Sequence, residues 1–275
     1  MFKTSMNDSK KDKKVLYTTT NEPFMPVRLY YKIHNEYLLI KTLRKLKCIE
    51  FENNKHFILS YFKEAKNLDL AVHYQEVPED LYPVIIAEGH IKQGEILHLD
   101  TKSLRRAVLV IDFLAKYVPP TIAEITHFAN SNKLTASISE KDLEAIVAEN
   151  YDKVFAEDVI QDIELYNIEN MGNIEVSSKH DDYENMDKLD KDVDDLREKI
   201  REEELKNYHN IERIKINYTR KEHADLINLL TFRSYTKEMV AMEHYKGNIN
   251  YCSIDAIDQI IKNVEGVEDD DSKYN

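Results

Sequence analysis

The sequence predicts an α+β fold: a largely antiparallel sheet with one or two packed helices, followed by an acidic all-helical region. Three observations predict it. Strand-like runs between 27 and 132 are joined mostly by short turns, which makes neighbouring strands antiparallel. An apolar stripe at helical spacing lies between two of these runs, over 101–118. Beyond Asn132 the strand signal disappears, and helical patterns rich in acidic residues replace it.

Charge divides the chain at about the same place. Of its 275 residues, 1–134 carry 20 Lys and Arg against 16 Asp and Glu, whereas 135–275 carry 18 against 35. The acidic half would repel phosphate, so it is a poor partner for nucleic acid or an anionic membrane. We expect four segments: a disordered tail at 1–24, an α+β domain at 25–134, a helical region at 135–266 and an acidic tail at 267–275.

The predicted sheet has six strands. Alternating or continuous apolar runs place them at 27–33, 48–52, 56–61, 82–87, 95–100 and 121–128. Gly94 indicates a hairpin turn near 91–94, because glycine accepts a positive φ at little cost. A polar stretch precedes the first strand. Its lysines, Lys10, Lys11, Lys13 and Lys14, favour a solvated tail over an arm that touches nucleic acid.

Two helices belong to this domain. Asn35 caps the first, over 36–47. Asp100 and Thr101 offer caps for the second, and Pro119 with Pro120 ends it. Its apolar stripe should cover one face of the sheet. The stripe consists of Leu104, Val108, Ile111 and Leu114.

Helical patterns recur beyond Asn132. A capping box at Ser139 begins one helix, and 154–166 suits a second short one. A mobile linker is expected near 167–185, where Gly, Ser and acidic residues gather. The longest helix should run over 223–246 and stop at Gly247, and a last short helix should run from Ser253 to Gly266.

A short heptad seam offers an interaction surface. Leu189, Val193, Leu196 and Ile200 recur with spacing 4, 3, 4. The seam fits a coiled coil with a partner chain. It also fits an amphipathic helix packed on its own domain or a two-helix hairpin, and fewer than three heptads favours this second interpretation.

Histidines offer a metal hypothesis. His90 and His98 lie on the two arms of one predicted hairpin, and His127 lies on another strand of the same sheet. Three imidazoles can hold a catalytic zinc ion. The sequence contains no HExxH or CxxC spacing to support this hypothesis, and it contains no cofactor-binding motif, so we expect no cofactor.

A second hypothesis concerns nucleic acid. Lys102, Arg105 and Arg106 could form a small basic patch at the start of a helix. Asp100 and Lys102 also have the acid-x-Lys form of some metal-dependent nucleases, with Glu88 or Glu95 as a companion. The position of Asp100 is also explained if its side chain caps the helix, in which case it needs no role in metal binding or catalysis.

Composition narrows the function class. No apolar run approaches the ~18 residues of a membrane span, and the N-terminus lacks a secretory apolar region. Two cysteines far apart, Cys48 and Cys252, fit a reducing cytoplasm. The leading hypothesis is a non-enzymatic interaction protein whose helical half presents the partner surface, either to a protein or to itself. The alternative is nucleic-acid binding or metal-dependent nuclease activity in the α+β domain.

Overall fold

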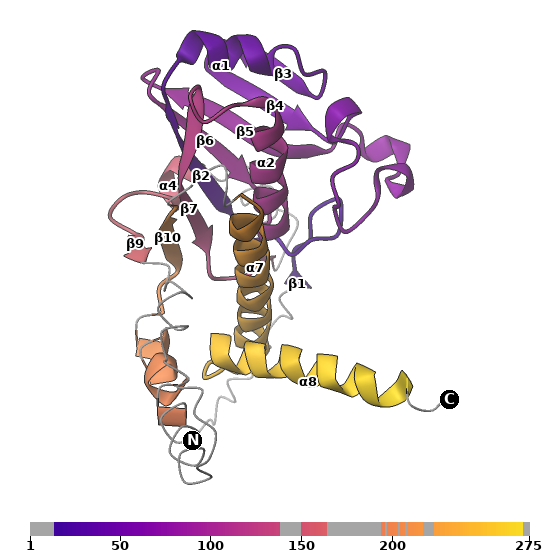
Figure 1. Cartoon of the computed structure of the whole chain (residues 1–275), viewed down its shortest axis with the longest axis vertical. Coiled ribbons are helices and arrows are strands. Elements are labelled where there is room, and N and C mark those ends of the chain that lie inside the picture. The colour runs from indigo at the N-terminus through magenta and orange to yellow at the C-terminus, as the bar shows by residue number, and fades with distance from the viewer. Residues whose placement is uncertain are drawn as a thin grey trace, which may run out of the picture.

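A single large sheet forms the centre of the molecule (Figure 1). The computed structural model describes residues 14–137, 150–163, 194–195, 197–202, 204–206, 208–216 and 223–271. Within them, eight strands are ordered β3-β4-β5-β6-β2-β7-β10-β9, and every neighbouring pair is antiparallel except β10 and β9. The strands are β2 (Val27–Ile33), β3 (Ile49–Asn53), β4 (His56–Ser60), β5 (Ile85–Lys92), β6 (Ile96–Thr101), β7 (Ala123–Ser131), β9 (Ile160–Ile163) and β10 (Ile211–Lys215). The predicted α+β class with a largely antiparallel sheet is confirmed.

All six strands predicted between 27 and 132 are present, the first with the predicted bounds and the other five with shifted ends. The hairpin that joins β5 to β6 turns through Gln93 and Gly94, both at positive φ (54° and 79°). The backbone N–H of Glu95 donates to the carbonyl oxygen of Lys92 at 3.1 Å, and the loop holds three residues, because Lys92 lies opposite Ile96. The turn fixes the register of the two strands, with His90 opposite His98.

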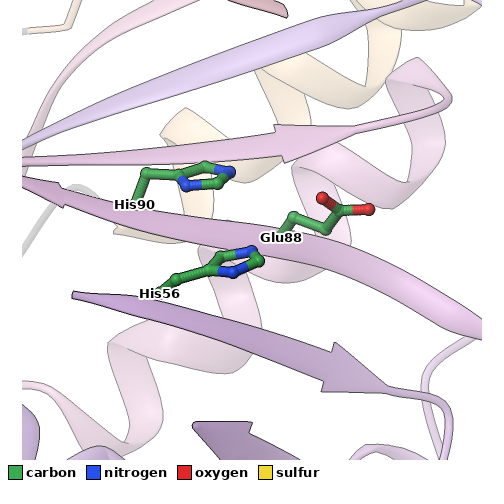
Figure 2. Close-up of side chains that lie close together, drawn as sticks. All are labelled: His56, Glu88 and His90. Atoms are coloured by element: carbon green, nitrogen blue, oxygen red, sulfur yellow. The ribbon is translucent and has the colours of Figure 1, made fainter. Parts of the chain in front are cut away.

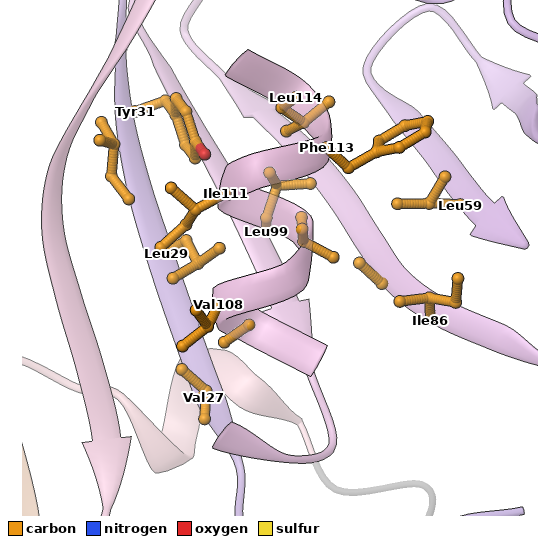
Figure 3. Close-up of a cluster of buried hydrophobic side chains, with 14 of the residues drawn as sticks. Val27, Leu29, Tyr31, Leu59, Ile86, Leu99, Val108, Ile111, Phe113 and Leu114 are labelled. Carbon is orange, nitrogen blue, oxygen red and sulfur yellow. The ribbon is translucent and has the colours of Figure 1, made fainter. Parts of the chain in front are cut away.

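The hydrophobic core lies between the sheet and α2 (Leu104–Tyr117). Figure 3 shows Val108, Ile111 and Leu114 of α2 directed at the sheet residues Leu29 and Leu99. The predicted stripe is therefore buried as expected. The predicted cap is wrong, because Ser103 caps this helix and its Oγ accepts the backbone N–H of Arg106.

Three further helices of the described residues are α1 (Glu36–Leu43), α7 (His223–Lys246) and α8 (Ser253–Asp271). Asn35 caps α1 as predicted. The α7 helix packs beside α2, and Gly247 ends it with a φ of 100°. In Figure 1, α8 crosses the lower end of α7 and projects away from the sheet.

The region 135–266 is not all-helical. Strand β10 pairs with β7, and β9 pairs with β10, so the sheet takes two strands from this acidic region. A two-residue strand, β8 (Ala136–Ser137), pairs with β1 (Lys14–Val15). The helix predicted over 154–166 is also wrong. A short helix, α4 (Tyr151–Val154), ends before it, and residues 160–163 form β9.

The segment predicted as a tail is ordered from Lys14 onward. Glu22 and Arg106 are both buried, and Arg106 Nε lies 3.2 Å from Glu22 Oε2. Arg106 also donates to Thr20 Oγ1 at 2.6 Å and to the carbonyl oxygen of Ile85 at 2.8 Å. A buried guanidinium needs such partners, so the prediction of disorder fails for 14–24.

Some predicted features lie outside the described residues. These are the three lysines before Lys14, the capping box at Ser139, the linker near 167–185, the last four residues of the acidic tail and three of the four seam residues, Leu189, Val193 and Leu196. None of the described helices is long and apolar enough to cross a membrane.

Candidate functional sites

The face of the sheet that points away from α2 carries a row of rings. His56, His90, His98, Tyr30 and His127 are in register on the neighbouring strands β4, β5, β6, β2 and β7. All five are partly buried. Side chains alternate between the two faces of a strand, so the residues beside them in sequence fill the core, as Phe57 and Leu99 do. We call this row of five side chains the ring row.

One end of the ring row forms a compact cluster. The imidazoles of His56 and His90 stack with ring centroids 4.4 Å apart and planes 7° from parallel. One nitrogen of each ring and one carboxylate oxygen of Glu88 all lie within 4.8 Å of one another. Figure 2 shows the carboxylate of Glu88 beside the same edge of both rings. Two imidazoles and a carboxylate thus converge on the surface of β4 and β5.

Two histidines of the ring row are held neutral. Burial, together with the neighbouring His56, lowers the pKa of His90 to about 4. Burial, together with the guanidinium of Arg28, lowers the pKa of His98 to about 4 as well. A neutral imidazole keeps a lone pair that can accept a hydrogen bond or bind a metal ion.

The three histidines predicted as a zinc site do not converge. His90 and His98 face each other as expected, but Tyr30 lies between His98 and His127 and contacts both rings edge-on, with centroids 4.9 and 6.1 Å away. The cluster keeps His90 and adds His56 and Glu88. Sequence reasoning missed His56 and Glu88 because the side chains opposite His90 depend on the register of β4 against β5, which no local motif marks.

In the acid-x-Lys motif, the carboxylate of Asp100 is already paired with another side chain. Asp100 is buried and forms two contacts with Arg28, at 2.6 and 2.8 Å. Arg28 also donates to Asp152 of α4 at 2.8 Å, and Lys92 reaches the same carboxylate at 3.1 Å. The ion pair with Arg28 therefore occupies the carboxylate that a nuclease would need for Mg²⁺.

The predicted basic patch is also dispersed. Arg106 is 1% exposed and pairs with Glu22 in the N-terminal segment 14–24. Arg105 reaches outward and pairs with Asp69 at 2.7 Å. Burial lowers the pKa of Lys102, and the negative charge of Glu88 opposes this shift. These three cations do not form one surface that a phosphate backbone could contact.

A different surface lies on α7. Leu230, Ser234, Lys237 and Ala241 are buried at spacing 4, 3, 4, and they mark the inner side of the helix. Phe232, Tyr235, Met239 and Met242 recur at spacing 3, 4, 3, and 3.6 residues per turn place them on the opposite side. Phe232 is 45% exposed and Tyr235 is 53% exposed. We call these four residues the outer stripe.

The one described residue of the predicted seam lies beside α8. Ile200 is partly buried in the helical residues 197–202. Arg201 binds Asp255 of α8 through two contacts at 2.7 and 2.9 Å, and Glu204 accepts from Ser253 Oγ at 2.7 Å. Ion pairs within the same chain therefore hold this segment against α8. Whether the seam as a whole packs on its own chain stays a prediction, because its other three residues lie outside the described residues.

Comparison with known proteins gives no further guide: no family model, no curated protein and no solved structure matches this chain.

Proposed function

We propose that this protein is an interaction protein that pairs with a second copy of itself through the outer stripe of α7. The supporting observation is that the outer stripe is apolar and lies opposite the side of α7 that is already buried. The helix packs against α2, whereas the outer stripe leaves two large aromatic side chains about half exposed. A stripe of large apolar side chains on a helix is normally covered by another surface.

The order of residues in the outer stripe favours self-pairing. Phe232 and Met242 lie equally far from Lys237, five residues to either side, and Tyr235 and Met239 lie two residues to either side. A twofold axis at this midpoint would pack two α7 helices antiparallel. Phe232 would then meet Met242 of the second copy, and Tyr235 would meet its Met239.

Each of these contacts brings an aromatic ring to a thioether. Such sulfur–aromatic contacts stabilise a packed pair by roughly 0.3–1.5 kcal/mol each. The symmetry makes every contact twice, so the pairing contains four of them. One helix face is a small interface, and we expect a dissociation constant on the order of 1–100 µM.

Sedimentation velocity of the full chain over a concentration series tests the pairing. The wild type should shift from monomer to dimer as concentration rises. Tyr235→Lys should weaken the dimer at least about tenfold, because the symmetry places the new charge in the interface twice. Tyr37→Lys is the matched control, since Tyr37 is 70% exposed on α1, away from the stripe. A wild type that stays monomeric throughout would contradict the proposal.

Cysteine cross-linking tests the register. We expect a chain with Phe232→Cys, mixed with a chain with Met242→Cys, to give the mixed disulfide in excess over either symmetric one. A parallel pairing would give the symmetric disulfides instead. The native thiols interfere little, since Cys48 and Cys252 are buried and burial raises the pKa of Cys48 to about 12.

A further inference from the structure

We propose that His56, Glu88 and His90 bind one divalent transition-metal ion of the zinc class. The site lies on the face of the sheet opposite α2 and is separate from the outer stripe. It differs from the three-histidine site that the sequence suggested, and it shares only His90 with it.

The backbone register builds the site. His56 on β4 lies directly opposite His90 on β5, and Glu88 precedes His90 by two residues on the same strand. A period of two puts Glu88 and His90 on one face, and cross-strand neighbours have Cβ atoms about 5 Å apart. The sheet thus holds three ligand-bearing side chains close together before any ion arrives.

His56 is oriented as a metal-binding histidine is. Its Nδ1 lies 2.8 Å from Glu52 Oε2, so this nitrogen carries the proton that is donated to the carboxylate. Its Nε2 is buried and has no hydrogen-bond partner among the described residues. A carboxylate on one imidazole nitrogen and a free lone pair on the other is the outer-shell arrangement found around bound metals.

The donor set indicates the class of ion. Two imidazole nitrogens and one carboxylate oxygen suit Zn²⁺, Co²⁺, Ni²⁺ or Cu²⁺, whereas Mg²⁺ and Ca²⁺ prefer oxygen ligands throughout. Metal–ligand bonds near 2.1 Å imply ligand atoms about 3.4 Å apart in a tetrahedral site. The three atoms now lie within 4.8 Å of one another, so rotation of the side chains suffices to close the site.

Three protein ligands leave at least one coordination position for water or an external ligand. The charges of Glu88 and Glu52 offset the charge of a divalent ion. The nearby cation Lys92 is paired with Asp152 at 3.1 Å. The structure thus combines a converging donor set with a carboxylate behind one donor.

Titration of the full-length protein with Co²⁺ and Zn²⁺ tests the site, by visible absorption and by calorimetry. We expect one equivalent of Co²⁺ to give the absorption of a four- or five-coordinate ion, and Zn²⁺ to displace it. His56→Gln, His90→Gln and Glu88→Gln should each weaken binding at least about tenfold. Glu52→Gln should weaken it about tenfold or more while the Co²⁺ spectrum keeps its shape, because Glu52 acts through His56.

His34→Gln is the matched control, because His34 also faces a carboxylate, with Nε2 3.0 Å from Glu124 Oε1, but joins no converging donor cluster among the described residues. It should bind the ion like the wild type. A second readout guards against misfolded variants: Zn²⁺ should raise the melting temperature of the wild type and of His34→Gln, but not that of His90→Gln. Absence of saturable binding by the wild type, or equal affinity in the three ligand variants, would overturn the proposal.

Discussion

Arg28 and Asp100 form a two-point ion pair across the centre of the sheet. They lie opposite each other on β2 and β6, with Nε to Oδ1 at 2.6 Å and Nη2 to Oδ2 at 2.8 Å. Both side chains are about 5% exposed or less. The third contact of Arg28, to Asp152, ties α4 to the same face, and the guanidinium also lies 5.5 Å from the ring centroid of Phe155.

Removal of one member of this pair should be costly. Arg28→Met leaves the Asp100 carboxylate buried without its partner, and we expect the free energy of unfolding to fall by about 3–5 kcal/mol. Urea unfolding at neutral pH measures the change. The double variant Arg28→Met with Asp100→Leu should recover much of the loss, because no charge is then left buried. A single variant that loses less than about 1 kcal/mol would contradict this account.

Gly89 is required by the ring of Phe57. The two residues are opposite each other on β5 and β4, and a Cβ placed on Gly89 would lie 2.2 Å from Phe57 Cζ. Gly89→Ala should therefore destabilise the fold by about 1–3 kcal/mol, through displacement of a ring that is 1% exposed.

The control for the Gly89→Ala prediction replaces Phe57 by a smaller side chain. In a Phe57→Leu background the smaller side chain leaves more room, so the added methyl group should cost clearly less there. Denaturant unfolding of all four chains gives the coupling between the two positions. Independent effects at Gly89 and Phe57 would show that the close approach does not limit the substitution.

Glu238 should make stability depend on pH. Burial raises the pKa of this carboxyl to about 7, with the charge of Glu22 adding to the shift and that of Arg105 opposing it. The ordinary pKa is 4.5. The folded state therefore holds the proton more tightly than the unfolded state. This carboxyl thus contributes stability that is complete below about pH 4.5 and is lost as the pH rises through 7.

Substitution isolates this contribution from those of other groups. Glu238→Gln should match the wild type near pH 4.5 and exceed its stability at pH 8 by on the order of 2 kcal/mol. Thermal or urea unfolding at both pH values gives the difference. A constant difference between the two proteins across this range would rule out titration of Glu238 as its source.

Local patterns were sufficient for much of the fold. The alternation of apolar residues located all six strands between Val27 and Asn132, and the spacing of Leu104, Val108 and Ile111 identified the side of α2 that is buried. Gly94 and Gly247 marked a turn and a helix end, where both adopt positive φ. These features depend on the conformational preferences and the spacing of residues only a few positions apart, so they can be predicted from the sequence.

Tertiary structure alone decided the rest. Residues 211–215 lie in the half of the chain where the strand signal disappears, and they form β10 by pairing with β7. The sequence places Arg106 in a basic patch that could contact an anion. In the structure its guanidinium pairs with Glu22, 84 residues earlier. His56 and His90 converge only because β4 and β5 pair in one register. A shift of one residue would turn either side chain into the core, and no local pattern encodes which partner a strand will choose.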